Sequence, residues 1–168
     1  MKPFEKYLWN ILALIFLSCQ GKVNYETSRN ELADVTLSNY EFIDIAGARH
    51  LLNDVKAKYK LLIFYDPEGK QSQQQIAEMQ KNTRLANLME KEGLRVIAIC
   101  PVGDLNHWNT YKNTIPAQWI NAFDIKGEAA IREFISIETF PTMLLISENN
   151  ELLKRGIDFQ SLLLVLDK

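Results

Sequence analysis

The segment after an apolar run at residues 61–65 contains the side chains with the clearest potential for chemistry. It reads Asp66-Pro67-Glu68-Gly69-Lys70-Gln71-Ser72 and leads into a helix-forming stretch from Gln73. A helix that begins here presents unsatisfied backbone amides, which can bind an anion or a carboxylate. Asp66 and Glu68 could also work as an acid–base pair, although acidic side chains at a helix start ordinarily cap the helix or interact with its dipole.

Two cysteines and two histidines are the remaining candidates for chemistry. Cys100 ends an apolar stretch that predicts a strand, where a cysteine is usually a small core residue. The carboxyl ends of parallel strands form the functional edge of an α/β sheet, so its thiol could instead lie near the turn described above. His50 and His107 do not have the spacing of metal ligands. The seven glycines form neither a phosphate-binding nor a dinucleotide-binding pattern, so we expect no metal and no cofactor.

The first 18 residues have the pattern of an export signal. Lys2 and Lys6 precede an apolar stretch from Tyr7 to Leu17, and Cys19 follows. Spanning a bilayer takes roughly 20 apolar residues, so this stretch is too short to serve as a stable membrane span. The pattern resembles a bacterial lipoprotein signal, which implies cleavage before Cys19 and attachment of a lipid to it. A plain secretory signal and a buried N-terminal helix are the alternatives.

Composition and length favour a single packed domain. The 168 residues have a formal net charge of −2, which provides no electrostatic footprint for nucleic acid. Residues 19–35 are polar and lack periodicity, so we expect a tether there and one domain at residues 36–168. With Cys19 lipidated, Cys100 has no disulfide partner within the chain, and the domain must be stabilised by packing alone.

The elements that would position these side chains follow an α/β order with a mixed sheet flanked by helices. Continuous apolar runs predict buried strands at residues 61–65 and 94–100, with helical stripes between them that restart near Asn82. We expect further strands at residues 40–45, 119–123, 142–147 and 152–155. We expect further helices at residues 48–55, 104–111 (capped by Asp104), 131–135 and 158–166 (capped by Asp158).

The segment Ile135-Ser136-Ile137-Glu138-Thr139-Phe140-Pro141-Thr142 precedes the expected strand at residues 142–147. With this segment and the order of elements, residues 35–168 resemble the thioredoxin-like superfamily. Within it, the chain is most similar to exported, membrane-attached redoxin-like proteins related to thiol-disulfide oxidoreductases of the bacterial envelope. The resemblance implies a thioredoxin-like fold with a cis Phe140–Pro141 bond facing the turn at residues 69–72.

Redox-active members of that superfamily have Cys-x-x-Cys at this turn. The helix N-terminus lowers the pKa of the first thiol, and the second thiol resolves the mixed disulfide. The corresponding positions here are Gly69 and Ser72, so the dithiol motif is lost. We therefore expect no dithiol catalysis.

The resemblance also implies a binding surface, because the backbone beside the cis-proline pairs with an extended peptide in the family. The residues carried over to that surface are Glu68, Gly69, Lys70, Ser72, Thr139, Phe140 and Pro141. Alternatively, Pro141 only shapes the loop and Phe140 only packs. We expect a non-catalytic peptide- or protein-binding module held at a membrane of the bacterial envelope by a lipid on Cys19, on the periplasmic side or at the cell surface. A monothiol oxidoreductase working through Cys100 and a structural subunit of an envelope complex are the alternatives.

Overall fold

A computed structural model describes residue 37 and residues 39–132 and 135–166. These residues belong to one compact unit, Leu32–Lys168. The expected signal at residues 1–18 and the expected tether at residues 19–35 lie outside the described residues. Cys19, the expected lipidation site, is the first residue of that tether. No helix among the described residues is both long enough and apolar enough to cross a bilayer.

In the described residues, seven strands form one sheet in the order β2-β1-β5-β4-β3-β6-β7. Their bounds are β1 Glu41–Asp44, β2 Arg49–Leu51, β3 Tyr59–Phe64, β4 Leu94–Cys100, β5 Ile120–Phe123, β6 Thr142–Ser147 and β7 Leu152–Arg155. The pairs β3–β4 and β4–β5 are parallel, and the other four pairs are antiparallel. The expected mixed sheet is therefore confirmed.

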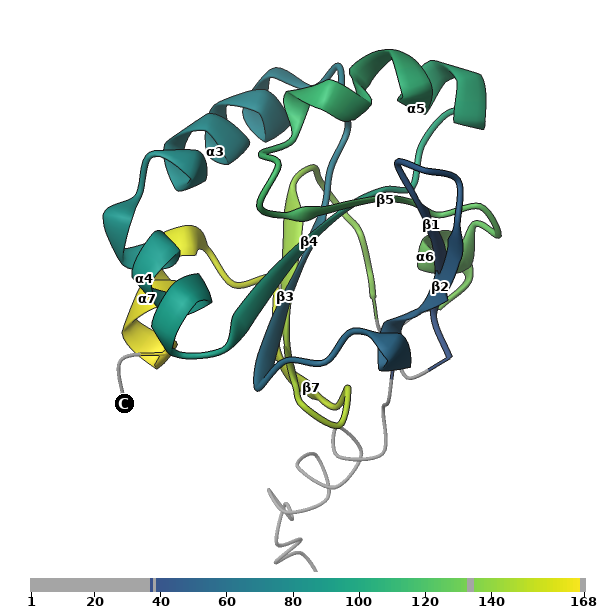
Figure 1. Ribbon diagram of the computed structural model, residues 1–168. Coiled ribbons are helices and arrows are strands. Elements are labelled where there is room, and N and C mark those ends of the chain that lie inside the picture. Colours follow the sequence, from purple (N-terminus) through teal and green to yellow (C-terminus); the bar gives the residue numbers. More distant parts are fainter. Residues whose placement is uncertain (1–36, 38, 133–134, 167–168) are drawn as a thin grey trace, which may run out of the picture. The chain divides into compact units, whose positions relative to one another are not determined.

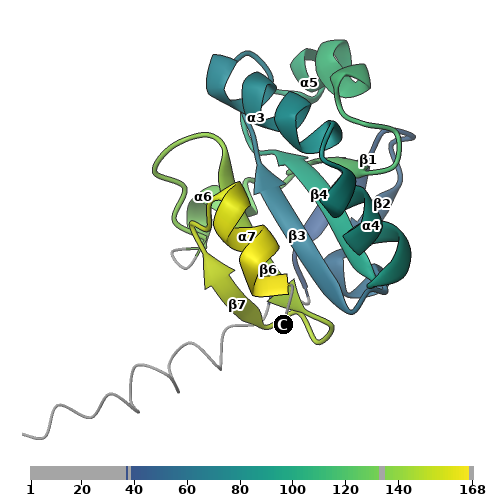
Figure 2. The same ribbon diagram turned by 90° about the vertical axis from the view of Figure 1, so that its left-hand side faces the viewer.

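Helices cover both faces of this sheet (Figure 1). The α-helices are α3 Lys70–Gln80, α4 Thr83–Lys91, α5 Leu105–Tyr111, α6 Glu128–Ile131 and α7 Phe159–Leu166, and the short 3-10 helices are η1 Leu52–Asp54 and η2 Lys112–Thr114. Figure 2 shows α4 and α7 side by side on one face of the sheet. The helix α6 contributes to the core on the opposite face.

The central strands are apolar throughout because both of their faces are buried. In β3, Leu61 and Ile63 point into a core shared with α3, α4, α5 and α7, whereas Leu62 and Phe64 point into the core beneath α6. The continuous apolar runs in the sequence thus correctly predict the two strands at the centre of the sheet.

Several helix boundaries follow from capping side chains. The Asn82 side chain accepts a hydrogen bond from the Leu85 amide (2.9 Å), which starts α4 after a break behind α3. Asp104 caps α5 by accepting from the His107 amide (2.8 Å). Asp158 accepts from the Ser161 amide (2.9 Å) at the start of α7. The expected restart near Asn82 and the expected caps Asp104 and Asp158 are confirmed.

The prediction of a helix at residues 48–55 is wrong. This segment contains β2 and the short helix η1, and β2 pairs with β1 through Phe42 opposite His50. The hairpin turn is held by Asp44 Oδ1, which accepts from the amides of Ala46 and Ala48 (2.9 Å each). Gly47 has φ +83°, a conformation that favours glycine. Pairing across the hairpin therefore overrides the local helical pattern.

The helix expected at residues 131–135 is shifted in the structure. The helix α6 spans Glu128–Ile131, and Asp124 caps it by accepting from the amides of Glu128 (3.0 Å) and Ala129 (2.7 Å). Ile135 is fully buried, but it lies after the helix. The apolar spacing correctly marked a core contact here, while the Asp124 cap determines where the helix begins.

Candidate functional site

The turn after β3 is closed by Asp66. The carboxylate of Asp66 accepts a hydrogen bond from the Glu68 amide (3.0 Å), and its carbonyl accepts from the Gly69 amide (3.1 Å). Gly69 then caps α3, with φ −68° and ψ 118°. Asp66 thus stabilises the turn through backbone contacts, which is the role expected of an acidic side chain at a helix start.

Gly69 and Ser72, where the family resemblance would place the two cysteines, have structural roles in this turn. Ser72 is fully buried, and its Oγ accepts a hydrogen bond from the Asp66 amide (3.2 Å). A Cβ atom added at Gly69 would lie 3.3 Å from both the Cβ and Oδ2 of Asp66, so the turn closes tightly around this glycine. Neither position supplies a nucleophile for thiol exchange, since the Ser72 hydroxyl serves as a hydrogen-bond acceptor inside the turn.

The loop before β6 lies close to this turn because the sheet brings them together. Phe64, the last residue of β3, pairs with Thr142, the first residue of β6. The Phe140–Pro141 peptide bond is cis, as the family resemblance implied. The Thr142 hydroxyl donates to the Thr139 carbonyl (2.6 Å) and stabilises the loop. Thr139 is exposed, while Phe140 and Pro141 are half-buried.

The loop and α3 share a cavity of about 430 Å³. Its lining residues are Gln71, Gln74, Gln75, Glu78, Thr139, Phe140, Pro141, Thr142, Met143, Gly156, Ile157 and Asp158. The structure therefore places the three loop residues of the expected surface, Thr139 to Pro141, beside α3.

The four turn residues of the expected surface do not line this cavity. Glu68 instead accepts a hydrogen bond from the Tyr111 hydroxyl of α5 (2.8 Å), and this contact raises the pKa of Tyr111. Lys70 is exposed, Gly69 is half-buried and Ser72 is buried. Whether these four residues bind a ligand stays a prediction.

Sequence reasoning missed the glutamine-rich face of α3. Gln71, Gln74, Gln75 and Glu78 recur at helical spacing, and the apolar residues of α3 occupy the other face. This polar periodicity was readable from the sequence. The contribution from the start of α7, such as Asp158, was not readable, because it depends on how the chain returns after β7.

Phe140 also lines a second cavity, of about 600 Å³, on the other side of the loop. Its lining residues are Pro101, Val102, Ala129, Ala130, Arg132, Ser136, Ile137, Glu138 and Phe140. A ligand that crossed Phe140 would therefore contact both hollows. We call the two cavities and the Phe140 ring between them the loop cleft.

Cys100 lies in the core. It has no exposed surface, and its Sγ donates a hydrogen bond to the Val102 carbonyl (3.3 Å). Burial raises the pKa of the Cys100 thiol to about 11, and the nearby Asp66 carboxylate also raises it. A reactive thiol requires the opposite conditions, namely access to solvent and a lowered pKa.

The histidines have local partners. His50 Nε2 lies 2.8 Å from Asp44 Oδ2, and the His50 ring stacks on Phe42 with 5.6 Å between the centroids. The His107 ring packs on Tyr111 at 5.2 Å. The described part of the chain contains no group of three or more histidine, cysteine or acidic side chains that could hold a metal ion.

Comparisons with known proteins give matches at the level of structure. No protein-family model matches the chain, and no curated protein matches its sequence significantly. A conserved protein of unknown function from Bacteroides fragilis superposes with a TM-score of 0.73 at 22% identity, over 80% of this chain and 98% of that chain. A thioredoxin-like protein from Bacteroides caccae gives a TM-score of 0.72 at 23% identity, over 84% of this chain and 53% of that chain.

A third similar structure is a domain of a named enzyme. The thioredoxin domain of a thiol-disulfide oxidoreductase from Bacteroides vulgatus superposes with a TM-score of 0.62 at 17% identity, over 79% of this chain and 96% of that chain. At these sequence identities the structural similarity establishes the fold of this chain, and it does not assign the activity of those proteins to it. The described domain of this chain has the thioredoxin-like fold.

Proposed function

We propose that this chain is an exported thioredoxin-like protein that binds extended polypeptide segments in the loop cleft and performs no dithiol chemistry. A lipid on Cys19 would hold it at a membrane of the bacterial envelope. The observation that supports binding most directly is the unpaired backbone of the cis-proline loop. Within the described residues, the amides of Thr139 and Phe140 donate to no other group.

Unpaired amides beside a cavity suit the addition of a strand. An extended peptide that ran along the loop would accept hydrogen bonds from these amides, and its side chains would enter the hollows on either side of Phe140. The glutamine amides of α3, each with a donor and an acceptor, could bind the peptide's backbone on the opposite wall. Gly69 and Ser72 contribute no thiol, so the bound segment would be held without covalent attachment.

The alternatives have less support from the molecule. A monothiol mechanism needs a reachable thiol, and Cys100 is buried with a raised pKa. A structural subunit would be expected to concentrate exposed apolar side chains in one patch. In the part of the chain that the structure describes, the exposed apolar side chains are spread over five regions: the β1–β2 hairpin, α5, α6, β7 and α7.

The test is binding of an unfolded model polypeptide, reduced and carboxymethylated α-lactalbumin, to the full chain. We expect the Thr139 and Phe140 amides to become protected from hydrogen exchange when the polypeptide binds. Phe140→Ala should weaken binding by about ten-fold, since an aromatic side chain at the centre of an interface typically contributes more than about 1 kcal/mol. Leu51→Ala, which truncates an exposed apolar side chain on the edge strand β2, is the matched control.

Two results would contradict the proposal. One is an unchanged exchange rate at both loop amides with saturating polypeptide. The other is equal affinity for Phe140→Ala and Leu51→Ala. Lipid attachment is tested separately by incorporation of labelled palmitate in a bacterial host, which Cys19→Ser should abolish.

A further inference from the structure

The charged side chains of the loop cleft are unbalanced toward negative charge. Glu78 of α3 and Asp158 at the start of α7 line the cavity of about 430 Å³, and no lysine, arginine or histidine among the described residues lines it. Gln74 Nε2 donates to Glu78 Oε1 (2.9 Å), which orients that carboxylate without neutralising it. The hydroxyl and amide of Ser161 lower the pKa of Asp158, so its carboxylate stays ionised.

The cavity on the other side of Phe140 contains one carboxylate that no cation pairs with in the described part of the chain. Its charged side chains are Glu138 and Arg132. Arg132 is already engaged, because its guanidinium forms an ion pair with Glu128 and donates to Asn39 Oδ1 (3.0 Å). Within the described part of the chain, the Glu138 carboxylate has no ion-pair partner.

Cations near the cleft do not offset these carboxylates. Lys70 is exposed at the start of α3 and lines neither cavity. Arg155 precedes Gly156 at the rim, but it lines neither cavity and has interactions of its own. A ligand crossing Phe140 would therefore meet Glu78 and Asp158 on one side and Glu138 on the other.

We propose that the loop cleft selects extended polypeptide segments with lysine or arginine on both sides of the residue that contacts Phe140. This inference rests on the proposed function and adds the chemistry of the partner. In an extended chain, residues two apart point to the same side and lie about 6.6 Å from each other. Basic side chains flanking a central apolar residue can thus reach carboxylates on either side of one aromatic ring.

The test uses three synthetic peptides that differ only in charge. Each has a central leucine in a threonine- and valine-rich stretch, flanked by two lysines, two glutamines or two glutamates. Fluorescence anisotropy with the full chain at low salt should rank the lysine peptide first, about ten-fold tighter than the glutamine peptide, with the glutamate peptide weakest. This ratio follows from two exposed charge pairs at about 5–7 Å, each contributing about three-fold in water. At about 0.5 M salt the preference should fall below about two-fold, because screening shortens the range of the interaction.

Isosteric variants locate the effect. Glu78→Gln/Asp158→Asn leaves the pair with Glu138 and should reduce the preference for the lysine peptide over the glutamine peptide to about three-fold. Asparagine still caps a helix, so α7 should remain folded. The matched control is Glu92→Gln/Asp54→Asn, which removes the same charge from two exposed residues and also replaces a capping aspartate, since Asp54 accepts from the Leu51 amide (2.9 Å). This control should keep the full preference.

The outcomes distinguish a failure of charge selection from a failure of polypeptide binding itself. Equal binding of all three peptides would overturn the charge selection and leave polypeptide binding in place. No binding of any peptide would overturn the proposed function itself. If the control variant lost the preference to the same extent, the net charge of the whole chain would be what attracts the lysine peptide. That result would overturn the inference. Circular dichroism of each variant confirms that its fold is intact.

Discussion

The Cys100 thiol should react with a thiol reagent at least about 100-fold more slowly in the native chain than in the unfolded chain. Burial raises its pKa from the ordinary value of 9.0 to about 11. At pH 8 this shift of two units lowers the thiolate fraction about 100-fold. The side chain also has no exposed surface, so the reagent must wait for the structure to open locally.

The same shift links stability to pH. The folded chain keeps the thiol proton at a pH where the unfolded chain releases it. The stabilisation is therefore complete below pH 9 and is lost as the pH rises through about 11. Two pKa units correspond to about 3 kcal/mol, which is an upper bound for the loss. Cys100→Ala should lack this pH dependence, so we expect the difference in free energy of unfolding between parent and variant to shrink over this range.

The assay uses the Cys19→Ser chain, in which Cys100 is the remaining cysteine, and the Cys19→Ser/Cys100→Ser chain as the blank. Maleimide labelling is followed from pH 6 to 10 with and without urea. Urea denaturation from pH 7 to 11 measures the free energy of unfolding of the Cys19→Ser chain and of its Cys100→Ala variant. Rapid native labelling with an apparent pKa below about 8.5 would refute the burial argument and restore the monothiol alternative.

Three further predictions concern the core and the turn. Lys60→Ala should lower the free energy of unfolding by about 2–4 kcal/mol, because it opens a cavity and removes the ammonium that binds Asn150 Oδ1 (2.6 Å). The surface change Lys81→Ala should alter this free energy by under about 0.5 kcal/mol. Equal effects of the two variants in urea denaturation would contradict the burial of Lys60. Tyr40→Phe should leave that free energy unchanged or raise it by about 1 kcal/mol, because the buried Tyr40 hydroxyl has no hydrogen-bond partner among the described residues. A loss above about 1 kcal/mol would mean that the hydroxyl is bonded. Gly69→Cys/Ser72→Cys should gain insulin-reducing activity that neither single variant has, since turnover needs an attacking and a resolving thiol, and a folded but inactive double variant would show that the turn no longer supports this chemistry.

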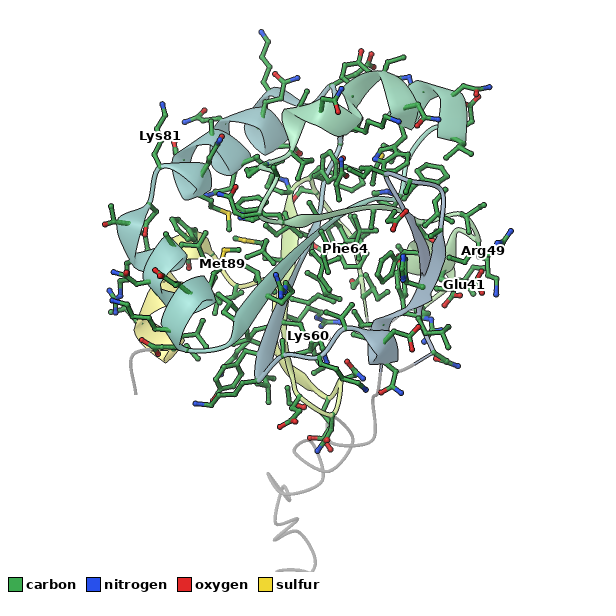
Figure 3. All side chains as sticks on the ribbon, viewed as in Figure 1. Glu41, Arg49, Lys60, Phe64, Lys81 and Met89 are labelled. Carbon is green, nitrogen blue, oxygen red and sulfur yellow. The ribbon has the colours of Figure 1, made fainter. Side chains whose placement is uncertain are left out.

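Lys60 illustrates where sequence reasoning stops in the sheet. The apolar run begins at Leu61, so the sequence predicts a strand that starts after the lysine, whereas β3 includes it. The Lys60 ammonium is held by Asn150 and by the Glu148 carbonyl (3.0 Å), both contributed by the β6–β7 turn. Figure 3 shows Lys60 inside the fold and Lys81 pointing into solvent. Burial lowers the pKa of Lys60. Partners about 90 residues away made this burial possible, and no local pattern encodes them.

Cys100 shows a second limit. In a strand buried on both faces every residue is apolar, so the sequence cannot reveal which face a given side chain occupies. The structure places Val96, Ala98 and Cys100 in the core beneath α3, α4, α5 and α7, and Ile97 and Ile99 in the other core. The register of β4 against β3 and β5 decided that the Cys100 thiol points into the core beneath α3, α4, α5 and α7.

The sequence by itself determined the central strands, the helix caps Asp104 and Asp158, and the absence of thiols at Gly69 and Ser72. These features depend on residue identity and on patterns within a few turns of chain, so folding does not alter them. Only the tertiary structure decided which groups share the loop cleft. Pairing of Phe64 with Thr142 brings the cis-proline loop to α3, and the return of the chain after β7 adds Asp158 to the cavity that Glu78 lines. Contacts between residues about 80 apart arise from the pairing of strands, and the local sequence around either partner does not specify them.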